Sequence, residues 1–188
     1  ILPFSIGSGR TSGDAANDAI DAGVYVVAAA GNDGEDDDGD VAHPSSEAGV
    51  ISVGGVTIKG THWSGSSKGD NNGRLLPLPI LMPRGDPNKK PEVVAPAEGV
   101  PVLTEDGGWG IADGTSAATV YVTGALCLLL EQKPELKPEA SNGADTVDTV
   151  KRWLMDSAVP EEGQTTHDDY YGYGLLNVSG LIDLATQA

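Results

Sequence analysis

Ser116 is the residue of this chain best placed to act as a nucleophile. It follows Gly114 and Thr115 and opens the stretch "SAATVYVTGALCLLLE", whose small and apolar residues predict a buried helix. Backbone N–H groups in the first turn of a helix are unpaired and favour negative charge, so they would supply part of an oxyanion hole. The stretch alone also allows a simpler interpretation, in which Thr115 or Ser116 only caps the helix.

Asn32 is a second candidate for the same chemistry. It follows Gly31 and the apolar run "VYVVAAA" (24–30), which is typical of a strand buried on both faces. Ligands of open α/β sheets bind at the carboxyl ends of the strands, and an amide side chain there can donate a hydrogen bond to an oxyanion. The alternative is an asparagine that serves only a turn.

The elements that would position these two residues follow from the spacing of apolar residues. Strand, helix and strand at close spacing predict a βαβ unit with a parallel sheet, hence an α/β fold class. Proline- and glycine-rich residues 65–91 predict a long irregular loop or an insertion. Strands are expected near the N-terminus, at 24–30 and at 50–56, and helices at 12–22, 115–131, 144–158 and close to the C-terminus. Cys127, inside an apolar run, is expected in the core.

The composition narrows the class of partner. With 28 acidic against 11 basic residues the net charge is −17, which argues against a nucleic-acid partner because phosphate contacts need a basic face. The charge fits a hydrated surface suited to high salt, or alternatively a set of cation sites. No apolar run is long enough to predict a membrane span. The chain begins at Ile1 without a visible leader, so we expect a processed product or an excerpt.

The motifs occur together in an order that resembles the subtilisin-like serine proteases. "AAAGN" precedes "GTSAATVYVTG", and "PFSIGSG", "HPSSEAGVISVGGV", "KPEVVAPAEGV" and "YGYGLLNVSGLIDLA" are similar to further segments of that family, in its order. The similarity covers nearly the whole chain. It implies the C-terminal part of a three-layer subtilisin-like domain, with residues 1–188 as one partial peptidase domain.

The resemblance implies a role for each matching residue. Ser116 would be the nucleophile, and Asn32 the side-chain donor of the oxyanion hole. Ser5, Ile6 and Gly7 would pair their backbone with the substrate as an added strand. A pocket would bind the substrate residue before the scissile bond, with His43 near its mouth. Its walls would be formed by two segments, Ala28, Ala29, Ala30 and Gly31 and then His43, Pro44 and Ser45.

The acid and base of a catalytic triad are not expected inside the chain. In the family order both precede the substrate strand, so both would precede Ile1. Asp21, His43 and Ser116 do fall in the order acid, base, nucleophile. However, Asp21 ends a predicted helix that Gly23 stops, His43 matches a pocket-wall position, and triads are recognised by geometry rather than order.

Two positions depart from the family pattern. Val120 and Tyr121 stand where the family has Pro-His after the nucleophile, which removes a proline that stiffens the helix start. Ala97 stands where the family has glycine, which tolerates more backbone shapes.

The acidic loop "DGEDDDGD" (33–40) is a weak metal candidate. Its carboxylates, Asp36, Asp38 and Asp40 among them, could bind Ca²⁺ through oxygen atoms. The alternative is a solvated loop. No cofactor is required by the predicted chemistry, and structural calcium is only an option that the resemblance allows.

The sequence therefore predicts a serine endopeptidase that works through an acyl-enzyme on Ser116, with peptide or protein as substrate. The chain alone is expected to be inactive and to need the N-terminal half of its own domain as a partner. The alternative is a degenerate half-domain that binds peptides or assembles without catalysis. The resemblance implies a secreted or extracytoplasmic protein, and neither a nucleic acid nor a membrane is expected as a partner.

Overall fold

The computed structural model describes residues 2–4, 9–36, 40–70, 72–75, 80–138 and 142–188. Its centre is a parallel sheet of β1 (Leu2–Phe4), β2 (Val26–Ala29), β3 (Ile51–Val56) and β6 (Val93–Pro96), in the order β1-β2-β3-β6. β2 and β3 are buried along their whole length, as continuous apolar strands covered on both faces must be. The predicted βαβ unit and α/β fold class are thus confirmed.

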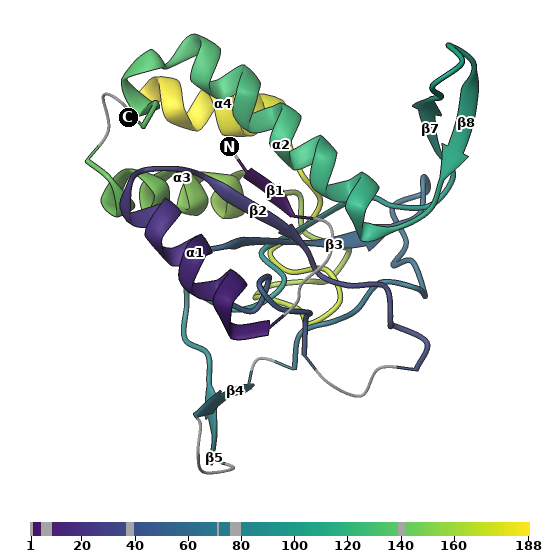
Figure 1. Ribbon diagram of the computed structural model, residues 1–188, viewed down its shortest axis with the longest axis horizontal. Coiled ribbons are helices and arrows are strands. Elements are labelled where there is room, and N and C mark those ends of the chain that lie inside the picture. Colours follow the sequence, from purple (N-terminus) through teal and green to yellow (C-terminus); the bar gives the residue numbers. More distant parts are fainter. Residues whose placement is uncertain (1, 5–8, 37–39, 71, 76–79, 139–141) are drawn as a thin grey trace.

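Helices cover the sheet (Figure 1). The helix α2 (Thr115–Gln132) crosses β1, β2, β3 and β6, while α1 (Gly9–Asp21) lies on the other side of the strands and contacts β2. The helix α3 (Ala144–Ser157) packs on α1 and α4 (Val178–Gln187), and the short 3-10 helix η1 (Pro134–Leu136) follows α2. In the part of the chain that the structure describes, no helix is long and apolar enough to cross a membrane.

Two hairpins project from this body, and the sequence predicted neither. The first, β4 (Asn72–Leu75) with β5 (Ile80–Pro83), lies in the 65–91 segment that was expected to be irregular. The second, β7 (Val100–Leu103) with β8 (Trp109–Ala112), leads directly into the start of α2 (Figure 1). The strand β8 thus connects an exposed ribbon to the segment that carries Ser116.

The helix α2 is apolar around its circumference, which is typical of a helix enclosed on all sides. Its inner face is buried, but Val120 and Leu128 on the other side are 65% and 48% exposed. Cys127 is also exposed, so the expectation of a core cysteine was wrong. The apolar run of the sequence correctly predicted the helix, but several apolar side chains of α2 are exposed.

A buried ionic cluster fastens α3 and the segment before β6 to β3. The Lys90 and Lys151 ammonium groups each lie 2.7 Å from the same Glu92 carboxylate oxygen, and all three side chains are fully buried. The second Glu92 oxygen accepts a hydrogen bond of 2.7 Å from the Ser52 N–H, and Lys90 donates to the Val50 carbonyl at 2.5 Å. Burial lowers the pKa of Lys90 to about 7, against the opposing pull of the Glu92 carboxylate.

Replacing Glu92 with glutamine is expected to lower the free energy of unfolding by about 3–5 kcal/mol, because two buried ammonium groups would lose their carboxylate. Urea denaturation of the full-length protein measures this. Glu98→Gln is the matched control, since Glu98 is exposed and its loss should cost no more than about 0.5 kcal/mol. Similar stabilities of the two variants would contradict the assigned role of the cluster.

Candidate active site

Asn32 and the start of α2 are joined by hydrogen bonds across 83 positions of sequence. The Thr115 N–H donates to Asn32 Oδ1 at 2.9 Å, and Thr115 Oγ1 lies 2.9 Å from the same oxygen and 3.1 Å from the Gly31 carbonyl. Because a backbone N–H can only donate, the side-chain atom that it meets must be the amide oxygen, which fixes the orientation of the Asn32 amide. Asn32 Nδ2 therefore remains available as a donor beside the helix start.

The turn before the helix favours glycine. Gly114 has φ of +144°, a conformation that residues with a side chain rarely adopt, whereas an added Cβ would be in ordinary contact with Asn32 Nδ2 at 3.5 Å. The Gly114 N–H donates to the Ala97 carbonyl at 2.7 Å, which ties the turn to the end of β6. The helix starts at Thr115, with Gly114 as its N-cap. Thr115 and Ser116 are thus the first two residues of the helix, so the simpler interpretation, in which one of them caps it, was wrong.

Ala97 is accommodated where the family pattern has glycine. Its side chain is fully buried, and its N–H donates to the Val56 carbonyl at 2.8 Å. The methyl group lies over Gly55, where an added Cβ would be only 2.6 Å away. The missing side chain at Gly55 therefore makes the space that Ala97 occupies.

Thr115 is the support that sequence reasoning missed. Thr115→Val keeps the backbone bond to Asn32 but removes the hydroxyl that lies between Gly31 and the Asn32 amide. We expect kcat of the full-length protein to fall about 10-fold with KM little changed, because the donor loses its alignment rather than its substrate contacts. Steady-state kinetics on a peptide substrate test this, and Thr115→Ser, which restores the hydroxyl, should recover most of the rate. A change confined to KM would contradict it.

The two segments predicted to wall a substrate pocket do lie together. Ala28 and Ala29 on β2 and Ala30 directly after it are buried, and the Ala42 N–H donates to the Ala30 carbonyl at 2.6 Å. Ser45 Oγ donates to the Ala28 carbonyl at 3.4 Å and lies 2.5 Å from Ser52 Oγ. Ser5, Ile6 and Gly7 lie outside the described residues. The pocket assignment stays a prediction.

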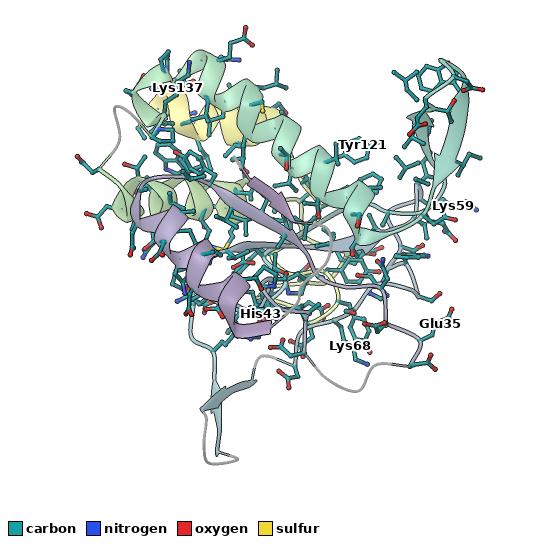
Figure 2. The ribbon with its side chains drawn as sticks, in the orientation of Figure 1. Glu35, His43, Lys59, Lys68, Tyr121 and Lys137 are labelled. Carbon is teal, nitrogen blue, oxygen red and sulfur yellow. The ribbon has the colours of Figure 1, made fainter. Side chains whose placement is uncertain are left out.

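His43 lies against α1 (Figure 2). Its Nδ1 is 3.4 Å from Glu47 Oε1, and a Cβ on Gly13 would be 2.5 Å from its Cε1. Asp21 ends α1, as predicted, with Gly23 at φ 82° behind it. Asp21 lies eight positions after Gly13 along α1, which is about 12 Å at 1.5 Å per residue. His43 therefore meets Glu47 rather than Asp21, which agrees with rejecting Asp21, His43 and Ser116 as a triad.

The other two histidines contact tyrosine rings of the C-terminal segment, Tyr170 for His62 and Tyr173 for His167. The His62 ring meets Tyr170 edge to face with 4.9 Å between centroids, and burial lowers its pKa. His167 Nε2 lies 2.9 Å from the Pro91 carbonyl, and burial likewise lowers the pKa of this imidazole. These contacts give both rings a structural role.

The three metal candidates of the acidic loop have different surroundings. Asp40 forms a two-pronged ion pair with Arg84, with Oδ1 2.7 Å from Nη1. Asp36 lines a pocket, and Asp38 lies outside the described residues. Among the residues that the structure describes, no three His, Cys, Asp or Glu side chains come close enough to hold a metal ion. The calcium hypothesis stays a prediction.

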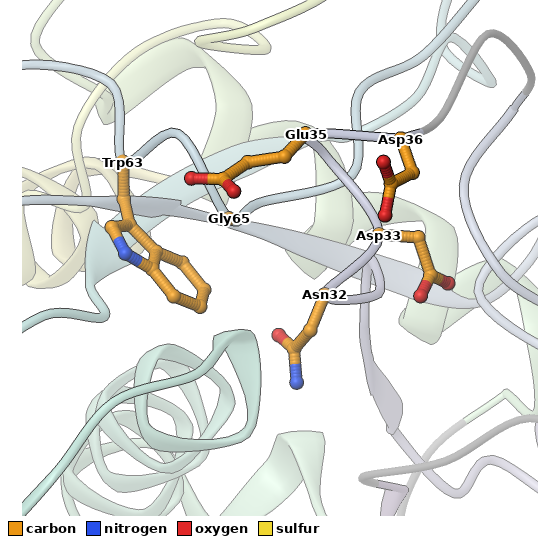
Figure 3. Close-up of a pocket in the computed structure, with 6 residues that line it drawn as sticks. All are labelled: Asn32, Asp33, Glu35, Asp36, Trp63 and Gly65. Carbon is orange, nitrogen blue, oxygen red and sulfur yellow. The ribbon is translucent and has the colours of Figure 1, made fainter.

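A pocket of about 320 Å³ opens beside Asn32 (Figure 3). It is lined by Asn32, Asp33, Glu35, Asp36, Trp63 and Gly65, which come from the loops after β2 and β3. Trp63 was not predicted as a site residue, and the signal that could have indicated it is its position shortly after the buried strand β3.

Comparisons with known proteins show the family of the chain. The family model described as "Subtilase family" matches residues 2–174, so the chain belongs to the subtilase family. It is 28% identical over 161 residues to Subtilisin E of Bacillus subtilis (strain 168), which covers 85% of this chain and 34% of the relative. It is 32% identical over 156 residues to the human membrane-bound transcription factor site-1 protease, covering 82% of this chain and 14% of the relative.

Solved structures show the same fold. The patellamide maturation protease PatA superposes with a TM-score of 0.69 at 24% identity, over 97% of this chain and 59% of that one. The prenylagaramide maturation protease PagA superposes with a TM-score of 0.67 at 26% identity, over 96% and 57%. The predicted subtilisin-like fold is confirmed. The chain spans only about a third of the length of the subtilisins that it matches.

Proposed function

We propose that the protein to which this chain belongs is a serine endopeptidase that cleaves peptide bonds through an acyl-enzyme on Ser116. The observation that carries the proposal is the hydrogen-bonded link between Asn32 and Thr115, which directs an amide donor to the start of the helix that holds Ser116. In this mechanism Ser116 Oγ attacks the scissile carbonyl while a general base takes its proton. The oxyanion is then held by Asn32 Nδ2 and by the Ser116 N–H.

The acid and base of the triad belong to a further part of the same domain, which is the proposed partner of this chain. Two observations support this. The chain covers 34% of Subtilisin E, and α2 carries the exposed apolar side chains Val120, Tyr121 and Leu128, of which Figure 2 labels Tyr121. Burying such side chains on a partner removes apolar surface from water, which favours association. The chain alone would therefore lack turnover.

A fluorophosphonate probe tests the proposal on the full-length protein. Such probes react with an activated serine, so we expect a covalent adduct on the peptide that contains Ser116 and none in Ser116→Ala. A folded full-length protein that takes no label would contradict catalysis and favour the second candidate.

The second candidate function is a non-catalytic half-domain that binds peptides or assembles with a partner. The observation that favours it is Tyr121, which is 42% exposed on α2 and stands with Val120 in place of the family's Pro-His. This departure alters the helix immediately behind the nucleophile. Labelling at Ser116 would exclude this candidate.

The cellular location, the salt environment and the calcium content of the enzyme are further parts of the proposal. Secretion or an extracytoplasmic location rests on the similarity to subtilisins. A salt-rich environment rests on the net charge of −17, because salt screens repulsion among surface carboxylates. Structural calcium rests on the acidic loop alone, and catalysis through Ser116 requires no cofactor.

A further inference from the structure

A buried serine, Ser67, binds the main chain on both sides of Asn32. The Ser67 N–H donates to the Gly31 carbonyl at 2.9 Å, and Ser67 Oγ accepts from the Asp33 N–H at 3.2 Å. These two peptide groups come directly before and directly after Asn32 in the chain. Thr115 binds Gly31 and the Asn32 amide from the side of α2. Ser67 therefore adds a contact to the main chain that follows Asn32.

Two glycines of the same loop allow the segment of Ser67 to come this close. Gly31 has φ of +120°, and an added Cβ there would lie 2.6 Å from Ser67 Oγ. An added Cβ on Gly34 would overlap the carbonyl oxygen of Ser66. A side chain at either glycine would therefore push the loop of Asn32 away from Ser67.

The neighbouring Ser66 connects this contact to the central sheet. Its Oγ accepts from the Gly55 N–H at 2.9 Å and donates to the Ser67 carbonyl at 3.0 Å. Gly55 lies in β3, which is buried along its whole length. Ser66 is 1% and Ser67 2% exposed, so water competes little for these hydrogen bonds. A chain of hydrogen bonds thus runs from β3 through both serines to the loop that carries Asn32.

We propose that Ser67 is a positioning residue for the candidate oxyanion hole, which keeps Asn32 Nδ2 in place by binding the Asp33 N–H. The inference rests on the proposed peptidase function and adds a residue to its site. A donor stabilises an oxyanion only if it is aligned in advance with the position where the charge develops. Thr115 orients the Asn32 amide, but the amide moves with its own backbone, and Ser67 fixes that backbone relative to β3.

A double-mutant cycle on the full-length protein tests this role. Ser67→Ala is expected to lower kcat for peptide hydrolysis about 10-fold with KM little changed, because the Asn32 donor loses its alignment while the substrate contacts stay. Asp33 is exposed, so water can bind its freed N–H and the fold should survive. In an Asn32→Asp background, where the Nδ2 donor is already absent, Ser67→Ala should change kcat by less than about twofold.

Ser64→Ala is the matched control for Ser67→Ala. It removes a serine hydroxyl from the same segment, but this hydroxyl donates to Glu35 Oε1 at 3.1 Å rather than binding the main chain beside Asn32. The control should leave kcat within about twofold of the unmodified protein.

Two results would overturn the role of Ser67 and leave the peptidase function intact. One is an unchanged kcat in Ser67→Ala, and the other is an equal loss of kcat in both backgrounds, as a general loss of structure would cause. If the unmodified protein showed neither turnover nor labelling at Ser116, the peptidase function would be wrong and the role of Ser67 would fall with it.

Hydrogen exchange measures the geometry without turnover. In full-length Ser116→Ala, adding Ser67→Ala should raise the exchange rate of the Asp33 amide at least about 10-fold, because its hydrogen bond is lost. Adding Ser64→Ala instead should leave that rate unchanged. An Asp33 amide that stays equally protected without the Ser67 hydroxyl would also exclude the proposed role.

Discussion

Replacing Ser116 with alanine in the full-length protein is expected to lower kcat for peptide hydrolysis about 10⁶-fold, a magnitude known from subtilisin itself. The reason is that the Ser116 hydroxyl forms the acyl-enzyme bond, so that one difficult hydrolysis is replaced by two easier steps. Without it, only binding and the oxyanion donors remain, and in subtilisin these give a residual rate about 10³–10⁴ above that in water. Steady-state hydrolysis of a chromogenic peptide measures the effect, with KM expected to stay similar.

Ser179→Ala is the control for that experiment. Ser179 is the second residue of α4, as Ser116 is the second residue of α2, and it is exposed. Its replacement should leave kcat within about twofold. If both variants kept the activity of the unmodified protein, the nucleophile would lie elsewhere and the proposed mechanism would be wrong.

The sequence alone predicted most of the scaffold, because strands and helices that are buried on both sides appear in the sequence as continuous apolar runs. Continuous apolar runs located β2 and β3, and the long apolar stretch after Gly114 located α2. The strand β8 escaped prediction because Trp109–Ala112 is a short segment that contains a glycine and has no buried residue, with exposed and half-buried positions alternating. Pairing with β7, rather than its own pattern, makes it a strand.

The site was only partly predictable for a related reason. Sequence motifs indicate Asn32 and Ser116 as site residues. The hydrogen bonds between Thr115 and Asn32, however, join segments 83 positions apart and depend on how the end of β2 packs against the start of α2. No local pattern contains that information. The same holds for Trp63 and Glu35, which belong to different loops and meet only after the strands have paired. Cys127 is exposed on α2, and an apolar run cannot show which of its members face outward.

The hydrogen bonds of Asn32 give the second large prediction. Asn32→Asp in the full-length protein is expected to lower kcat by about 10²–10³, the loss known for removal of an oxyanion donor in subtilisin, with KM changed little. The aspartate keeps an oxygen to accept from the Thr115 N–H, so the link to α2 survives. Only the Nδ2 donor is lost, and a carboxylate repels the developing oxyanion. Steady-state kinetics and an unchanged melting temperature together check this.

A second substitution separates the two roles of Asn32, the Nδ2 donor to the oxyanion and the Oδ1 acceptor that holds the Thr115 N–H. Asn32→Leu also removes the acceptor, leaving the Thr115 N–H without its partner, so kcat should fall at least as far as in Asn32→Asp and stability should fall too. Asn142→Asp, on an exposed residue before α3, adds the same charge and should change neither quantity. If Asn32→Asp kept full turnover, Asn32 would serve only to fasten the loop to the helix, and the oxyanion would depend on backbone N–H groups at the start of α2.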